Sequence, residues 1–249
     1  MKSVINNASR TDHLEFVLRL DIDDPAIQEY QMMLEALKTE YPHVAINVRG
    51  GSRCKQSLMW NQAAELANND LIMMGNDDCI LHTKNWDTYI KDVPLILGHN
   101  YFVLVGDIYT KGLDKSSSFP CVSREYYAYH GYYAPGIYYA LCTDVWISEI
   151  ASMAGCLVSV KGLRYKHLHV KYGAMLADET HGYARRREYA HKDSATHHET
   201  KELREIIAKS LRGYLDRLVV KNPAAILAQS QNIIYVNPQE NTVEFVPVP

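Results

Sequence analysis

Apolar and polar positions predict a regular alternation of strands and helices through the first half of the chain. Glu15 to Leu20 predicts a strand that ends on acids in the run DIDDP, where Pro25 suits the first turn of a following helix. The same order recurs further along, with a helix over 26–41, a strand over 43–49, a helix over 54–69 and a strand over 71–74. Strands separated by helices of this length predict a parallel sheet with helices on its faces.

The second half of the chain has a less regular pattern, rich in tyrosine from Tyr101 onward. Residues 144–155 predict a helix that Asp144 is placed to cap and Gly155 to end. A polar, histidine-rich stretch then precedes a long amphipathic helix over 199–220. The final segment predicts two short strands about an Asn-Pro turn.

Composition and charge narrow the class of protein. The 249 residues are 47% hydrophobic, which is enough for one large globular domain, and the formal net charge of −3 argues against wholesale electrostatic capture of nucleic acid. No run of about 18 apolar residues occurs and the first ten residues lack the apolar centre of a secretion signal, so we expect a soluble, cytoplasmic protein. Five widely spaced cysteines without a C-x-x-C pair favour reduced thiols over a disulfide framework or a zinc ribbon.

Acidic side chains stand at the ends of two predicted strands. Asp21, Asp23 and Asp24 follow the first strand, while Asp77 and Asp78 interrupt the apolar run DLIMMGNDDCIL. Adjacent acids in such a run carry a high desolvation cost unless something compensates them. Ligands of open α/β sheets bind beyond the carboxyl ends of the strands, so both acidic clusters are expected to converge on one site. The simpler alternative is that these acids cap helices or form turns.

These motifs resemble those of glycosyltransferases with the GT-A fold, in particular the family 2-like group. GNDDCILHTKNWD is similar to the family's metal motif and the tryptophan after it, TDVWISEIASMAG to the segment with the acceptor-side carboxylate, and KHLHVKYGAMLADETH to the histidine-containing closing loop. The likeness covers roughly residues 15 to 190. It differs from the usual pattern in a first helix that is shortened or absent, and in Asn-Asp-Asp where Asp-x-Asp is usual.

The resemblance implies an α/β fold with a mixed, mostly parallel sheet flanked by helices, a C-terminal helix and a short hairpin-like tail. Residues 1–222 would form the catalytic domain, with a nucleotide-sugar-binding half over 1–100 and an acceptor half and lid over 101–190. Residues 223–249 would form the tail with short strands. Within the acceptor half, Lys171 to Thr180 is expected to close over the donor.

The resemblance also implies a reaction and roles for single residues. A metal-dependent enzyme would move a hexose or pentose from a nucleoside-diphosphate sugar, with UDP expected, to a hydroxyl acceptor with inversion. Asp78 would bind Mn²⁺ or Mg²⁺, with His169, or less favourably His167, as a late ligand. Asp144 would accept the proton of the acceptor hydroxyl. The donor would be bound by a set of polar side chains, in which Asp77 meets the ribose and Asp21 or Asp23 the base: Asp21, Asp23, Asn61, Asp77 and Asp178.

Two other classes of protein remain open at this stage. A non-catalytic module that binds a sugar nucleotide or carbohydrate would keep the architecture without a competent metal site. A zinc hydrolase would draw on His167, His169, His191, His197 and His198, although no H-E-x-x-H spacing is present. Arg185, Arg186 and Arg187 would clamp a phosphate or simply form a solvated face.

The acceptor and the oligomeric state are not fixed by the sequence. A small molecule, a glycan and a hydroxymethylated base of phage DNA all fit a hydroxyl acceptor, and a homo-oligomer is not excluded. An extruded base would stack on tyrosines, for which the candidates are Tyr126, Tyr127, Tyr132 and Tyr133. The alternative for these tyrosines is packing in the core.

Overall fold

The computed structural model describes residues 1–76, 78–91, 93–94, 100–108, 119–168, 187–219, 232–237 and 242–247. The helices are α1 (Lys2–Asn7), the 3₁₀ turn η1 (Thr11–His13), α2 (Ile27–Glu40), α3 (Gln56–Ala64), α4 (Trp86–Ile90), α6 (Arg124–His130), α7 (Thr143–Ala154), α9 (Arg187–Glu199) and α10 (Lys201–Val219). The strands are β1 (Glu15–Asp21), β2 (Ala45–Gly51), β3 (Leu71–Met73), β4 (Cys79–Leu81), β5 (Val103–Ile108), β6 (Cys121–Ser123), β7 (Leu157–His167), β8 (Asn232–Asn237) and β9 (Thr242–Pro247).

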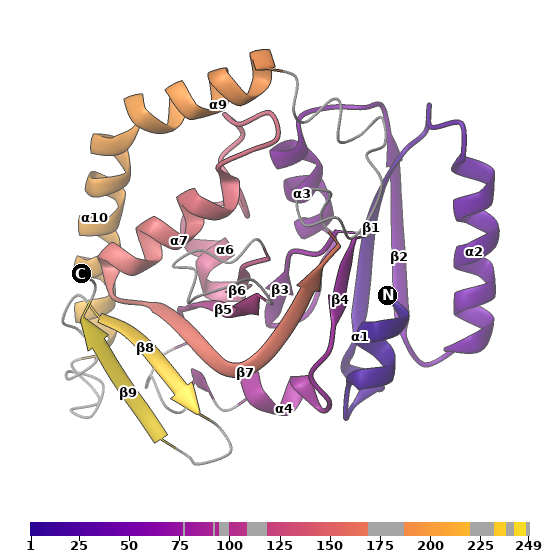
Figure 1. The fold of residues 1–249 in the computed structure, drawn as a ribbon, viewed down its shortest axis with the longest axis horizontal. Helices are drawn as coiled ribbons and strands as arrows, with labels where there is room; N and C mark the ends of the chain where they lie inside the picture. The colour runs from indigo at the N-terminus through magenta and orange to yellow at the C-terminus, as the bar shows by residue number, and fades with distance from the viewer. Residues whose placement is uncertain are drawn as a thin grey trace.

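The strands form two separate sheets (Figure 1). β1 and β2 pair in parallel, from Glu15 opposite Ala45 to Asp21 opposite Gly51, and α2 lies beside them. The larger sheet has the order β3-β6-β5-β7-β8-β9, and β4 pairs with β7 outside this path. The first half of the chain therefore contributes β1 and β2 to one sheet and β3 and β4 to the other.

The mixed α/β class predicted from the sequence is confirmed, whereas a mostly parallel sheet is not. In the described chain only β1 with β2, β5 with β7 and β7 with β8 are parallel. The other four pairings are antiparallel. The sequence pattern could not show this for β4 and β6, because they are three-residue strands whose direction depends on distant partners.

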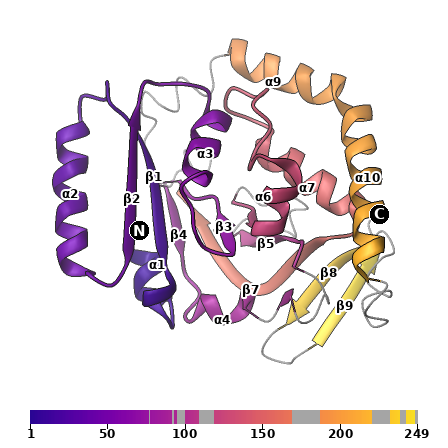
Figure 2. The same cartoon turned by 180° about the vertical axis from the view of Figure 1, so that it is seen from behind.

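Helices α6, α7 and α10 pack over one face of the larger sheet, as the reverse view shows (Figure 2). α7 buries Trp146, Ile147 and Ile150 against strand residues such as Val103, and α10 adds Leu211 to the same cluster.

Helix α7 ends where Gly155 adopts a left-handed conformation (φ 75°), as predicted. Its start differs from the prediction, because the helix begins at Thr143 after Cys142, so Asp144 lies in the first turn and does not cap it.

The two ends of the described chain differ in how well they follow the sequence prediction. The hairpin near the C-terminus is confirmed, with Asn232 opposite Pro247 and Asn237 opposite Thr242. The amphipathic helix predicted over 199–220 is confirmed as α10, and the structure adds α9 at the end of the polar, histidine-rich stretch before it. At the N-terminus, residues 2–7 form the short helix α1, which packs on β4 through a 2.7 Å hydrogen bond from Asn7 Nδ2 to the carbonyl of Leu81.

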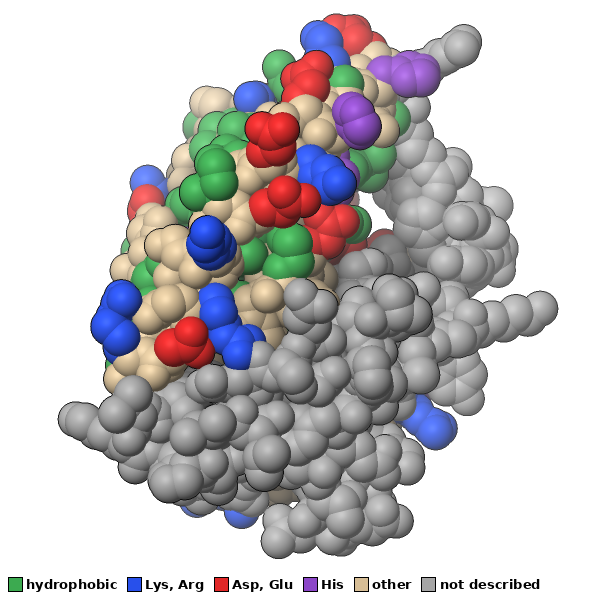
Figure 3. All heavy atoms as spheres, turned by 90° about the vertical axis from the view of Figure 1, so that its left-hand side faces the viewer, with side chains coloured by type: hydrophobic (Ala, Val, Ile, Leu, Met, Phe, Trp, Pro, Cys, Tyr) green, Lys and Arg blue, Asp and Glu red, His purple; other side chains and the backbone are tan. Residues whose placement is uncertain are grey.

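The surface formed by α9 and α10 carries both signs of charge. On the face that Figure 3 shows, basic and acidic side chains are interspersed, and several form pairs one helical turn apart, such as Lys192 with Glu188 and Arg212 with Asp216. Exposed pairs of this kind add little stability, and their mixture gives this face no single-signed stripe. Within the described part of the chain, no helix combines the length and apolarity that crossing a membrane requires.

Gly106 gives a direct test of the packing between β5 and β7. The pairing of these strands shifts register after Gly106, where a Cβ atom would lie 2.3 Å from the Tyr165 ring and 2.5 Å from the carbonyl oxygen of Leu163. Gly106→Ala should lower the free energy of unfolding by about 1–3 kcal/mol, because the backbone must move to make room. In the matched control Gly213→Ala, on α10, the nearest atom is 4.0 Å away and stability should be unchanged or higher. Urea unfolding measures both; equal values would contradict this packing.

Candidate functional site

A cavity of about 1740 Å³ lies between the two sheets, and residues at the ends of β1 and β3 border it. Asp21 and Asp24 line it from the end of β1, and Gly75 and Asn76 line it from the loop after β3. More than fifty positions of sequence separate these segments. The ends of the two strands therefore line the same cavity, although Asp23 and Asp78 are not among the residues that line it.

Asp21 is held by two arginines. Its carboxylate lies 3.2 Å from Nη1 of Arg19 and 3.3 Å from Nε of Arg53. Arg19 is almost fully buried, with 4% of its side chain exposed, and it also donates to Gln62 Oε1 at 2.7 Å and to the carbonyl of Ser52 at 2.6 Å. A Cβ atom at Gly51 would lie 2.7 Å from this guanidinium, so glycine leaves the room that Arg19 occupies.

The other two acids after β1 are not equivalent. Asp24 Oδ1 accepts a 2.8 Å hydrogen bond from the amide of Ala26, just before α2, so Asp24 forms the turn that leads into this helix. Asp23 is exposed, and no hydrogen bond or ion pair to it is made within the described residues. Of the three, Asp23 is the carboxylate left available to a ligand.

The loop that contains Asp78 is fixed against the end of β7. The amide of Leu168 donates a 2.8 Å hydrogen bond to the carbonyl of Asp78, and Cys79 stands opposite His167 in the antiparallel β4–β7 pair. Burial, with the neighbouring charge of Asp78, raises the pKa of the Cys79 thiol to about 12. The acidic motif and the His-Leu-His segment, ninety positions apart in the sequence, are therefore neighbours, and the thiol between them stays protonated at neutral pH.

Several of the predicted ligands lie outside the described residues. These are Asp77, His169 and Asp178, together with the predicted closing segment Lys171 to Thr180. Among the residues that the structure does describe, no three His, Cys, Asp or Glu side chains gather closely enough to hold a metal ion. Of the residues predicted to bind a metal, the structure describes Asp78, and the β4–β7 pairing places the main chain of His167 opposite the neighbouring Cys79.

Asn61 has a structural role in the fold. Its Oδ1 accepts from the amides of Tyr133 and Ala134, both at 2.9 Å, and its Nδ2 donates to the carbonyl of Ala134 at 2.8 Å. The side chain thus ties α3 to the loop after α6 and does not belong to the cavity wall. A direct contact from Asn61 to a sugar nucleotide would require these bonds to break.

Asp144 lies at the start of α7, on a loop that other elements hold in place. Asp193 of α9, with 1% of its surface exposed, accepts three hydrogen bonds of 2.8–2.9 Å from the amides of Tyr139, Ala140 and Leu141. Ser57 of α3 donates to the carbonyl of Tyr138 at 2.8 Å. This loop runs directly into α7, so α3 and α9 together determine where the carboxylate of Asp144 lies.

The negative charge of Asp144 contributes to a raised pKa at the neighbouring thiol of Cys142. Burial, aided by the carboxylates of Asp193 and Asp144, raises the pKa of the Cys142 thiol to about 11. Carboxylates in the first turn of a helix are stabilised by the partial positive charge there. Asp144 is half-buried, and it is not among the residues that line the cavity between the sheets.

The tyrosines predicted as stacking candidates divide into two groups. Tyr126 and Tyr133 are core residues, with 1% and 2% of their surface exposed, so the packing alternative is correct for both. Tyr127 and Tyr132 are only partly buried. The candidate zinc-ligand His197 is also engaged, since its Nδ1 lies 3.1 Å from the Tyr138 hydroxyl and its Nε2 lies 3.4 Å from Glu149.

Sequence reasoning missed the residues that position the site. Arg19 offers a signal in principle, because a cation inside an apolar strand requires an anionic partner. Arg53 and Asp193 offer none, since one is a charge in a polar turn and the other lies on a polar helix. Only the contacts between distant segments show that Arg53 holds Asp21 and that Asp193 holds the loop at 139–141.

Arg19 and Arg53 provide a matched pair of substitutions. Arg19→Met should lower the free energy of unfolding by about 2–4 kcal/mol, because Asp21 and the carbonyl of Ser52 lose a buried partner. Arg53→Met should cost less than about 1 kcal/mol, because 51% of that side chain is exposed. Urea unfolding distinguishes the two, and equal losses would show that Arg19 does not organise this end of β1.

Comparison with known proteins leaves the family of this chain open. No protein-family model matches the sequence, and no curated protein matches it either.

Proposed function

We propose that the protein is a metal-dependent glycosyltransferase of the GT-A type, which transfers a sugar from a nucleoside-diphosphate sugar, with UDP as the nucleotide, to a hydroxyl acceptor with inversion. The observation that carries this proposal is the 2.8 Å hydrogen bond from Leu168 N to the carbonyl of Asp78. It holds the acidic motif beside the histidine-containing segment, and these are the two motifs on which the resemblance to this enzyme class depends most.

The donor is assigned to the mouth of the cavity where the strand ends meet. Asp21 and Asn76 border this mouth from opposite sheets, and Asp23 is exposed beside it. Carboxyl ends of strands are the usual ligand position in α/β proteins. Asp23 is the better candidate for a hydrogen bond to the base, because the carboxylate of Asp21 is already paired with Arg19 and Arg53.

The chemistry around Asp78 fits a hard divalent cation such as Mn²⁺ or Mg²⁺. A carboxylate oxygen is a hard ligand of the kind that these ions prefer. When bound, such an ion would offset the negative charge that develops on the diphosphate as the glycosidic bond breaks. Asp78 would hold it, and Asp77 and His169 are the further ligands predicted from the sequence.

Asp144 is assigned the proton transfer. Its carboxylate would take the proton from the acceptor hydroxyl while the oxygen forms a bond to the anomeric carbon. The bond from that carbon to the diphosphate oxygen breaks at the same time, and the nucleoside diphosphate leaves with the electron pair. Asp144 lies in the first turn of α7, where the partial positive charge of the helix end favours a carboxylate, which is the form that a general base needs.

Asp78→Asn tests the metal site without a large change in shape. Binding of UDP in the presence of Mn²⁺ should weaken at least about tenfold, or ~1.4 kcal/mol, because the variant loses the charge that holds the ion. The exposed control Asp216→Asn, on α10, should bind as the parent does. Titration calorimetry with and without Mn²⁺ measures both, and unchanged Mn²⁺-dependent affinity in Asp78→Asn would overturn the assignment.

Asp144→Asn tests the base. With the best donor from a thermal-shift screen in Mn²⁺ and any acceptor that accepts sugar from it, donor affinity should be retained and transfer should fall at least about a hundredfold. Glu202→Gln, which removes an exposed acid from the first turn of α10, is the control and should transfer normally.

Three results would contradict parts of this account. Near-native transfer by Asp144→Asn would show that Asp144 is not the base. A product that keeps the anomeric configuration of the donor would rule out direct inversion. Donor binding without transfer to any acceptor would favour a binding module on the same fold.

A further inference from the structure

One edge of β1 has no strand beside it. The amide of Ala45 donates to the carbonyl of Leu14, and the amide of Ile22 donates to the carbonyl of Gly51, which fixes the phase of the parallel β1–β2 ladder. Even-numbered residues of β1 therefore face β2, and the main-chain groups of Glu15, Val17 and Arg19 point to the opposite edge. Within the described chain no main-chain hydrogen bond from another strand reaches that edge.

β3 presents a second free edge. The amide of Arg124 donates to the carbonyl of Asp70, and the amide of Met74 donates to the carbonyl of Pro120, so Ile72 between them faces β6. The main-chain groups of Leu71 and Met73 then point away from β6. No strand pairs with them among the residues described, and both residues line the same cavity as β1.

The cavity between these edges has the size of a strand. All seven residues of β1 line it, and its volume of about 1740 Å³ exceeds the roughly 300–1,000 Å³ of ordinary small-molecule sites. A seven-residue strand is about 23 Å long and takes ~4.8 Å between neighbouring strands and ~10 Å between layers, or roughly 1,100 Å³. The volume that such a strand would not fill is large enough to leave the cavity open near Asp21 and Asp24.

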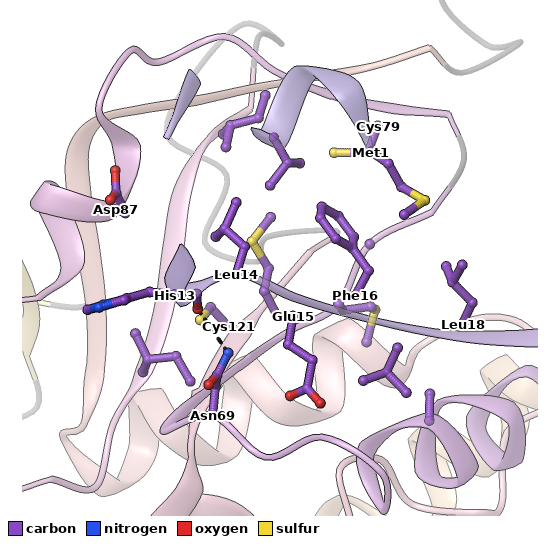
Figure 4. Close-up of a pocket in the computed structure, with 18 of the residues that line it drawn as sticks. Met1, His13, Leu14, Glu15, Phe16, Leu18, Asn69, Cys79, Asp87 and Cys121 are labelled. Atoms are coloured by element: carbon purple, nitrogen blue, oxygen red, sulfur yellow. Dashed lines mark hydrogen bonds between the residues drawn. The ribbon is translucent and has the colours of Figure 1, made fainter. Parts of the chain in front are cut away.

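The slot between β1 and β3 is lined mostly by apolar side chains, although Glu15 and Arg19 add polar groups from β1. Figure 4 shows Phe16 on the side of Met1 and Cys79, while Glu15 points the other way toward Asn69. On one side the wall is completed by Val4 of α1, and on the other Met59, Trp60 and Ala63 of α3 contribute. Strands that are covered on both faces consist of nearly continuous apolar residues.

We propose that an extended, mostly apolar polypeptide segment binds in this slot as an additional strand between β1 and β3. Its main chain would pair with Val17 and Arg19 on one side and with Leu71 and Met73 on the other. Two rows of unpaired donors and acceptors that face one cavity are satisfied together by a strand, and an apolar small molecule would leave both rows unpaired. The added strand would join the two sheets into one.

Hydrogen exchange with a synthetic peptide tests this proposal without any nucleotide or metal, so its outcome is independent of the proposed enzymatic function. The probe has a core of about six alternating valine and isoleucine residues, with two lysines at either end for solubility. Two control peptides carry N-methyl groups on alternate core residues, so that each lacks the donors on a single edge. The amides of Leu18 and Leu20, which face β2, serve as internal references.

The unmodified peptide should slow exchange of the Val17, Arg19 and Met73 amides at least tenfold while Leu18 and Leu20 stay unchanged, and both N-methylated peptides should have no effect. Phe16→Lys, which places a charge in the slot, should weaken peptide binding at least tenfold, whereas Val48→Lys on exposed β2 should not. No slowing at saturating peptide would overturn the proposal. So would protection of Val17 and Arg19 before peptide is added, with sedimentation showing whether a second copy or the chain itself covers the edge.

Discussion

Main-chain hydrogen bonds along β7 determine where the chemistry of this protein can lie. β7 pairs with β4, β5 and β8, so three segments from distant parts of the chain take their positions from one strand. At its end the amide of Leu168 reaches the carbonyl of Asp78, and the acidic loop cannot move away without leaving both groups unpaired. The side chains proposed for metal and diphosphate therefore depend on a backbone contact more than on their own interactions.

The carboxylates of this protein have different physical roles that the sequence does not distinguish. Asp193 is buried and receives three amide hydrogen bonds, which suits an acid that holds a loop in place. Asp21 is neutralised by two arginines, and Asp24 forms a turn. Asp23, by contrast, is exposed in a turn whose neighbours Asp21 and Asp24 line the cavity, and Asp78 lies beside the end of β7, so these are the acids best placed for a ligand.

Features with a local cause were predictable from the sequence. The pattern of Glu15 to Leu20 predicted a strand, Gly155 ends a helix because it adopts a left-handed conformation, and the two predicted C-terminal strands pair as β8 and β9. Features that depend on contacts with distant segments could not be predicted from the sequence. The antiparallel direction of β4 and the addition of β8 to β7 depend on partners far along the chain, and the amide of Asn61 looked free for a ligand although it binds the loop at Tyr133.

Paramagnetic broadening by Mn²⁺ tests the central claim most directly, because it locates the ion without assuming any acceptor. In an amide spectrum with UDP present, substoichiometric Mn²⁺ should broaden the signals of Asn76, Asp78 and Leu168 first and leave those of α10 sharp. Mg²⁺ at the same concentration should shift these signals without broadening them. Broadening centred elsewhere, or none when UDP is bound, would contradict a metal and nucleotide site at the end of β7.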